Sequence, residues 1–179
     1  DLQKIPGVKN VFVASGIRHD LLLADQKHAS AYLRRLVRHH ISGQLKIAPE
    51  HTAPGVLALM GKPGVQSLTD FKNLFETINS EAPPKRFLTY YFIAAHPGCT
   101  EEDMRDLKSF ASRELKTRPE QVQIFTPLPS TWSALMYWTG RDPQNGNKIY
   151  VEKDPVKKQR QKDVLTAGRK RPVHGQVNR

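Results

Sequence analysis

Two groups of polar residues follow apolar runs of the sequence and have side chains that could do chemistry. Glu50 and His51 follow one short run, and the segment HPGCT, which starts at His96, follows the longest run in the chain. A carboxylate such as that of Glu50 can accept hydrogen bonds from ribose hydroxyls or from an amino group. The HPGCT segment precedes a predicted helix, whose first N–H groups can bind an anion. Each group also has a plainer interpretation, as a solvated loop carboxylate and as a turn followed by a helix cap.

Other side chains offer weaker signals. Arg18 and Asp20 either pair with one another or bind an anionic group bidentately, and we favour the surface ion pair. Cys99 is more typical of a small packed residue than of a nucleophile. No tight ligand-spacing motif is present, so we predict no metal site. The alternative is a metal bound by residues that come from neighbouring strand ends, namely Glu50, His51, His96 and Cys99.

These residues must be positioned by a regular alternation of predicted strands and helices. Short runs rich in β-branched, aromatic and other apolar residues predict strands over 8–14, 44–48, 86–95 and 121–125. Apolar residues at helical spacing predict helices over 28–41, 52–60, 67–78 and 100–115, and a short apolar helix over 132–137. A turn at 142–146 and a small strand at 149–151 complete the pattern.

The boundaries of these elements also carry predictions. We expect Pro49 to end the second strand and Thr52 to cap the helix that follows it. Capping boxes are predicted where a hydroxyl residue precedes an aspartate by three positions, at 67–70 and at 100–103. The longest apolar run, 86–95, lacks clean alternation, which favours a strand covered on both faces. The aromatic residues Trp132, Tyr137 and Trp138 are more typical of a core than of a stacking platform for bases.

The alternation favours an α/β fold with a parallel sheet and right-handed crossovers, specifically the later strands of a partial (β/α) TIM-like barrel. In such barrels the reactive groups collect where strands end and the next loops begin. We therefore expect the chemistry at the loops that follow the four strands. In this interpretation the polar residues of these loops form part of an active site, and the chain is a piece of an enzyme.

Composition supports a second function class. The net charge is +11, and the stretch 151–179 holds nine Lys or Arg and three acidic residues. The alternative function is therefore a basic module that binds nucleic acid or another polyanion through this stretch, although such a run is more often a solvated face. The single cysteine excludes an internal disulfide and favours a cytoplasmic setting. No run approaches the roughly 20 apolar residues of a membrane span, so we expect no membrane partner.

Several segments together resemble one family over about 5–153. The following segments occur in the family's order: IPGVKNVFVASGIRHD, HHISGQLKIAPEHT, VLALMGKP, YFIAAHPGCTEEDM and PEQVQIFTPLPSTWSALMYWTG. They are similar to the later half of the YgiQ-type radical SAM proteins. More distantly, APEHTAPGVLALMGK and FIAAHPGCTEEDM resemble the fourth-strand and fifth-strand segments of methylthiotransferase-like radical SAM enzymes.

This resemblance implies a cofactor chemistry but names no substrate or reaction. Radical SAM enzymes use a partial β/α barrel and a [4Fe-4S] cluster held by a Cys-x3-Cys-x2-Cys motif near the first strand. They cleave S-adenosylmethionine to a 5′-deoxyadenosyl radical. The cysteine motif is missing here, and the chain begins without Met. We therefore expect a fragment that supplies strands three to six and is inactive alone, its partner being the upstream segment of the same protein.

The resemblance also assigns cofactor-facing residues and a division of the chain. It implies a barrel half over 1–128, a C-terminal extension over 129–153 and a basic, partly disordered tail over 154–179. The residues that it places against S-adenosylmethionine are Ser15 and Arg18 from the third strand, Glu50 from the fourth, Ile93 and His96 from the fifth, and Phe125 from the sixth.

Overall fold

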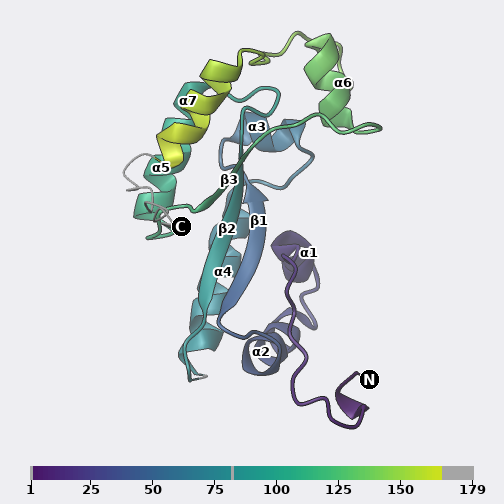
Figure 1. Ribbon diagram of the computed structural model, residues 1–179, viewed down its shortest axis with the longest axis vertical. Coiled ribbons are helices and arrows are strands. Elements are labelled where there is room, and N and C mark those ends of the chain that lie inside the picture. Colours follow the sequence, from purple (N-terminus) through teal and green to yellow (C-terminus); the bar gives the residue numbers. More distant parts are fainter. Residues whose placement is uncertain (1, 82, 167–179) are drawn as a thin grey trace, which may run out of the picture.

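A computed structural model describes residues 2–81 and 83–166 of the chain (Figure 1). Its elements in chain order are the 3-10 helix η1 (Leu2–Lys4), α1 (His19–Ala24), α2 (Ala29–His39), β1 (Gln44–Glu50), α3 (Pro54–Leu59), α4 (Gln66–Ser80), β2 (Phe87–Ala94), α5 (Glu101–Arg113), β3 (Gln121–Ile124), α6 (Trp132–Thr139) and α7 (Pro155–Thr166). Within the described ranges, no helix has the length and apolar character needed to cross a membrane.

The strands form one parallel sheet in the order β1-β2-β3. This mixed α/β arrangement agrees with the predicted fold class at the level of a partial β/α fold. Pro49 does not end β1, contrary to prediction, because the strand continues to Glu50 through a register shift that follows Ile47. Proline has no N–H to give to a ladder, and an irregular position of an edge strand tolerates that loss.

The predicted strand over 8–14 is wrong. This segment has no regular secondary structure and makes no ladder, and an isolated parallel bridge between Ile17 and Ile47 follows it. Its hydrogen bonds go instead to the end of α2, where the N–H of Val13 donates to the carbonyl oxygen of His40 at 2.8 Å. β-branched residues favour a pleated, half-buried surface, but a strand also needs a neighbour to pair with.

The small strand predicted at 149–151 is also wrong. In the described part of the loop after α6, the bridge that forms joins Arg141 to Lys148 in antiparallel fashion. The backbone of Tyr150 has a different role, because its carbonyl oxygen accepts a 2.7 Å hydrogen bond from the N–H of Gly98. This bond ties the later loop to the end of β2.

Helices cover one face of the sheet, and the core lies between these helices and the sheet. Figure 1 shows α4 behind the sheet and α7 beside α5. On β2 the buried positions alternate with half-buried ones, so Tyr90, Phe92 and Ala94 face the helices. The prediction that 86–95 is covered on both faces is therefore wrong. The other face of the strand, which carries Tyr91 and Ile93, stays partly open and is available for a site.

Two of the three predicted helix caps differ from expectation. Thr100 and Asp103 form the predicted capping box of α5, with both reciprocal hydrogen bonds present. Thr52 does not cap α3, because the N-cap is Ala53 and Pro54 occupies the first helical position. The box expected at 67–70 is absent, since the N-cap of α4 is Val65, two residues before the expected cap, and it makes no side-chain cap hydrogen bond.

The segment 154–179, expected to be a basic and partly disordered tail, begins as an ordered helix. α7 packs against α5 and contacts β2 and β3. Two of its own residues, Gln161 and Leu165, are buried. Residues 167–179 lie outside the described residues, and the three-part division of the chain stays a prediction. The helix brings a buried amide, Gln161, to the end of β2.

Candidate functional site

Four of the six predicted cofactor residues line one cavity at the carboxyl ends of the strands. The cavity has a volume of about 460 Å³. Its lining includes Glu50 from the end of β1, Ile93 from β2, His96 from the loop after β2 and Phe125 from the residue after β3. Because the strands are parallel and adjacent, their carboxyl ends meet at one edge, which is why residues far apart in the chain converge there.

Glu50 reaches the cavity from an unusual backbone position. Its φ is 67°, in the left-handed region that non-glycine residues rarely occupy, and it follows the register shift in β1. Its carboxylate lies 3.3 Å from the ammonium nitrogen of Lys62. Lys62 also donates to the carbonyl oxygen of Ala48 at 2.9 Å, which orients its side chain. The charge of Glu50 is thus partly balanced while the carboxylate still faces the cavity.

His96 is a buried, neutral histidine with a defined tautomer. Its Nδ1 lies 2.8 Å from the carbonyl oxygen of Pro97, which can only accept, so Nδ1 carries the proton. Its Nε2 lies 2.8 Å from the hydroxyl of Ser133 and accepts that hydrogen bond. Burial lowers the pKa of His96, which keeps the ring uncharged at neutral pH. The ring meets Phe125 edge to face at 5.1 Å.

Ser15 and Arg18 are not among the residues that line this cavity, although Arg18 interacts electrostatically with Glu50. The Ser15 hydroxyl donates to the neighbouring carbonyl oxygen of Gly16 at 3.3 Å. Arg18 pairs with Asp20, with 2.8 Å between Nε and Oδ1, as the ion-pair interpretation of the sequence expected. The guanidinium holds the pKa of Asp20 at about 2, mainly through this hydrogen bond. The cofactor roles of Ser15 and Arg18 stay predictions.

The cavity also contains residues that the sequence analysis did not select. Tyr91 donates its hydroxyl to the side-chain oxygen of Gln123 across β2 and β3. Ser133, from the first turn of α6, accompanies His96 as described above. Alternation along β2 could have indicated Tyr91, because it lies on the same face as Ile93. No local signal indicates Ser133, which is 37 residues from its histidine partner.

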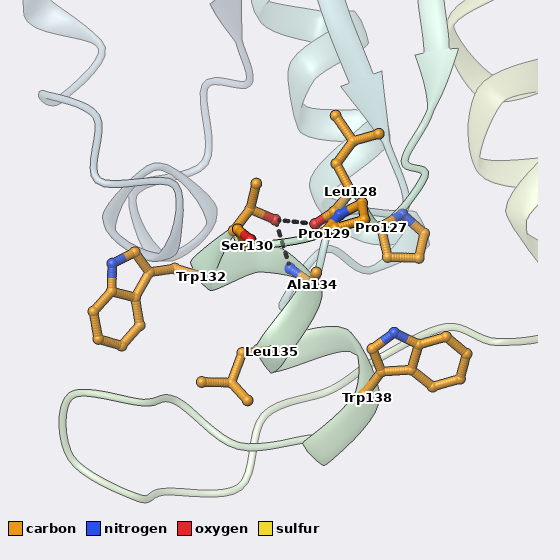
Figure 2. A pocket seen from close by; sticks show the side chains of 9 residues that line it. Pro127, Leu128, Pro129, Ser130, Trp132, Ala134, Leu135 and Trp138 are labelled. Atoms are coloured by element: carbon orange, nitrogen blue, oxygen red, sulfur yellow. Dashed lines mark hydrogen bonds between the residues drawn. The ribbon is translucent and has the colours of Figure 1, made fainter.

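A second, more apolar cavity of about 710 Å³ adjoins the first and shares Leu128 and Thr131 with it. Its lining includes Trp132 and Trp138, which Figure 2 shows on opposite sides of α6. The prediction that both tryptophans belong to a core is wrong, because 66% and 69% of their surfaces are exposed. Tyr137 is half-buried and packs against Phe125 at 5.9 Å, linking α6 to the first cavity.

Behind the first cavity lies a buried pair, His51 and Cys99. The N–H of Ala53 donates to Nδ1 of His51 at 3.0 Å, so the proton of the neutral ring is on Nε2, which faces the Cys99 sulfur at 3.5 Å. Burial lowers the pKa of His51 to about 4 and raises the pKa of Cys99 to about 12. Both groups are therefore neutral near pH 7, and the pair is not an activated thiolate nucleophile.

The metal hypothesis finds no support in the described residues. His51 and Cys99 contact each other, but Glu50 pairs with Lys62 and His96 with Ser133. Across 2–81 and 83–166, no group of three or more His, Cys, Asp or Glu side chains is placed to hold a metal ion.

The relatives found by comparison with known proteins share one name, UPF0313 protein. No family model matches the chain. It is 58% identical to a UPF0313 protein of Fusobacterium nucleatum, an alignment that covers 94% of the chain and 30% of the relative. UPF0313 proteins of Thermotoga petrophila and Clostridium perfringens are 44% and 40% identical, each over 92% of the chain and over 29% and 24% of the relative. The chain thus spans less than a third of the length of these relatives.

Proposed function

Because the chain is homologous to a segment of the UPF0313 proteins, the YgiQ-type family, we propose that it is the S-adenosylmethionine-binding part of a radical SAM enzyme. The observation that carries the proposal is the convergence of Glu50, Ile93, His96 and Phe125 on one cavity. In this proposal β1, β2 and β3 are later strands of a partial β/α barrel. The residues that hold the [4Fe-4S] cluster lie in the rest of the protein, and the chain alone is inactive.

The donor set of the cavity fits the parts of S-adenosylmethionine. A volume of about 460 Å³ lies within the range of small-molecule sites. Ile93 and Phe125 offer apolar walls to a planar adenine, and the Glu50 carboxylate can accept from ribose hydroxyls or from an ammonium group. His96 is uncharged, so it does not repel the positive charge of the cofactor. The group when bound, together with the cluster, would supply radical chemistry.

In this proposal each residue has a binding role. Glu50 exchanges part of its interaction with Lys62 for hydrogen bonds to the ligand, since the two groups are 3.3 Å apart and the Glu50 side chain is 27% exposed. His96 keeps Nδ1 bound to the carbonyl of Pro97, which holds the ring edge against Phe125. Phe125 is itself backed by Tyr137, so the aromatic wall has support from α6.

Replacing Glu50 by Gln is expected to weaken binding of S-adenosylhomocysteine, a stable analogue, about tenfold. The change keeps the size of the side chain but removes the charge, and hydrogen bonds to charged groups contribute about 1.5–3 kcal/mol. Isothermal titration calorimetry on the whole chain measures the affinity. Glu76→Gln is the matched control, because Glu76 is an exposed residue of α4 paired with Lys72. Equal affinity of the Glu50→Gln variant and the unchanged chain would remove Glu50 from the site.

A second experiment tests whether the cluster ligands lie elsewhere. The chain is incubated anaerobically with iron and sulfide, and its visible absorption is recorded. We expect no [4Fe-4S] absorption, since several thiolates are needed and the chain has one cysteine. A stable cluster spectrum from this chain alone would contradict the proposal that the cluster ligands lie in the rest of the protein.

A further inference from the structure

A buried polar side chain of α7, that of Gln161, contacts the backbone at the end of β2. Gln161 is 2% exposed, although the rest of α7 is dominated by exposed charged and polar residues. Its Oε1 accepts from the N–H of Ala95 at 2.9 Å and from the Cys99 thiol at 3.3 Å. Its Nε2 donates to the carbonyl oxygen of Cys99 at 3.1 Å. One amide therefore holds both ends of the segment 95–99, which carries His96.

Two residues of this segment have left-handed backbone conformations, although the segment also makes its own turn, in which the N–H of Cys99 donates to the carbonyl oxygen of His96 at 2.8 Å. Ala95 has φ 57°, in the left-handed region that is unfavourable for a residue with a Cβ. Gly98 has φ 87°, and a Cβ there would lie 2.4 Å from Cδ1 of Leu59, so a substitution would be strained and would force the Leu59 side chain to move. Residues in such conformations persist when the surroundings impose them. The N–H of Ala95 donates to Oε1 of Gln161, and this hydrogen bond helps to fix the first of these two residues.

The contacts of Gln161 continue into the loop after β1. Cys99 also contacts His51, whose ring is bound in turn by the N–H of Ala53. A continuous set of hydrogen bonds thus runs from the start of α3 through His51, Cys99 and Gln161 to Ala95. His51 directly follows Glu50, and Ala95 directly precedes His96. The set therefore connects the backbone next to one proposed ligand residue with the backbone next to the other.

We propose that Gln161 is a positioning residue, which holds the 95–99 segment so that His96 faces the cavity at a set distance from Glu50. This inference rests on the proposed function for the identity of the ligand, but the hydrogen bonds that carry it do not involve a ligand. A side chain that served packing alone would not need to be polar, because a buried amide destabilises a fold unless its hydrogen bonds are made. Leu165, one turn further along α7, provides that kind of packing.

The test compares Gln161→Leu with Leu165→Ala in the whole chain. Gln161→Leu removes the three hydrogen bonds and keeps an apolar contact, whereas Leu165→Ala loosens α7 and keeps the hydrogen bonds. Amide hydrogen exchange by NMR is followed at Ala95 and, as an internal reference, at Phe92 in the middle of β2. For Gln161→Leu we expect exchange at Ala95 to accelerate at least about tenfold relative to Phe92, as a local opening would. For Leu165→Ala we expect the two amides to accelerate together.

Two further readouts separate positioning from general destabilisation. Nuclear Overhauser contacts between the rings of His96 and Phe125 should weaken in Gln161→Leu and persist in Leu165→Ala. Gln161→Glu keeps an oxygen that can accept from Ala95, so slow exchange at Ala95 should return. This variant also serves if Gln161→Leu does not fold. Equal acceleration at Ala95 and Phe92 in Gln161→Leu, with the His96 contacts intact, would overturn the inference.

Binding of S-adenosylhomocysteine distinguishes this inference from the proposed function. If both hold, Gln161→Leu binds the analogue about tenfold more weakly than Leu165→Ala. If the unchanged chain binds no analogue but Gln161→Leu still releases Ala95 and His96, the proposed function fails and the positioning of His96 stands. If the chain binds the analogue and Gln161→Leu binds equally well, Gln161 does not position the site.

Discussion

Lowering the pH from 7 to 4 is expected to reduce the free energy of unfolding by about 3 kcal/mol through His51 alone. Burial lowers the pKa of His51 from its ordinary 6.5 to about 4. Between these two values the unfolded chain binds a proton that the folded chain does not bind. The stability is therefore complete above pH 6.5, falls as the pH drops toward 4, and loses nothing more from this group below that pH.

Urea denaturation at several pH values between 7 and 4 measures this slope. His51→Asn is the diagnostic variant, because its side-chain oxygen can still accept from the N–H of Ala53 while the titrating ring is gone. His39→Asn, on the exposed face of α2, is the matched control and should retain the slope. Burial also lowers the pKa values of His19 and His96, so a smaller slope of the same sign should persist in the His51 variant. An unchanged slope in His51→Asn would contradict the assignment.

Replacing Phe92 by Ala is expected to lower the free energy of unfolding by about 3–5 kcal/mol, because it empties a large volume in a packed interior. Phe92 is fully buried in the central strand β2 and faces the helices. Phe87→Ala makes the same chemical change in the same strand, where 65% of the side chain is exposed. We expect this control to change stability by no more than about 0.5 kcal/mol.

Chemical denaturation of both variants at pH 7 checks the prediction. A similar cost at the two positions would mean that β2 does not turn one face to the helices and the other to the cavity. That orientation matters for the site, because Tyr91 and Ile93 face the cavity only if Phe92 faces the core. The stability measurement is therefore also a test of the site geometry that needs no ligand.

The fold and part of the site could be predicted from local patterns. The three strands of the sheet, the helix over 28–41 and the capping box of α5 depend on residues near one another in the chain, so periodicity and side-chain chemistry suffice. The same patterns place Glu50 and His96 at neighbouring strand ends, since parallel strands bring their carboxyl ends to one edge, whereas Ile93 and Phe125 are selected by the family resemblance alone. The segment 8–14 failed as a strand, because its β-branched residues do not reveal whether a pairing partner lies beside them.

Local sequence patterns therefore predict the three strands of the sheet, most of the helices between them and the strand ends that carry polar groups. The contacts between buried polar groups, in contrast, depend on how distant segments pack together. Gln161 lies 66 residues from Ala95, and Cys99 lies 48 residues from His51. In the sequence, Gln161 belongs to a charged run, and its burial depends on how α7 packs against α5. Short-range propensities act over a few residues, whereas such contacts depend on the packing of the whole chain, which local patterns do not encode.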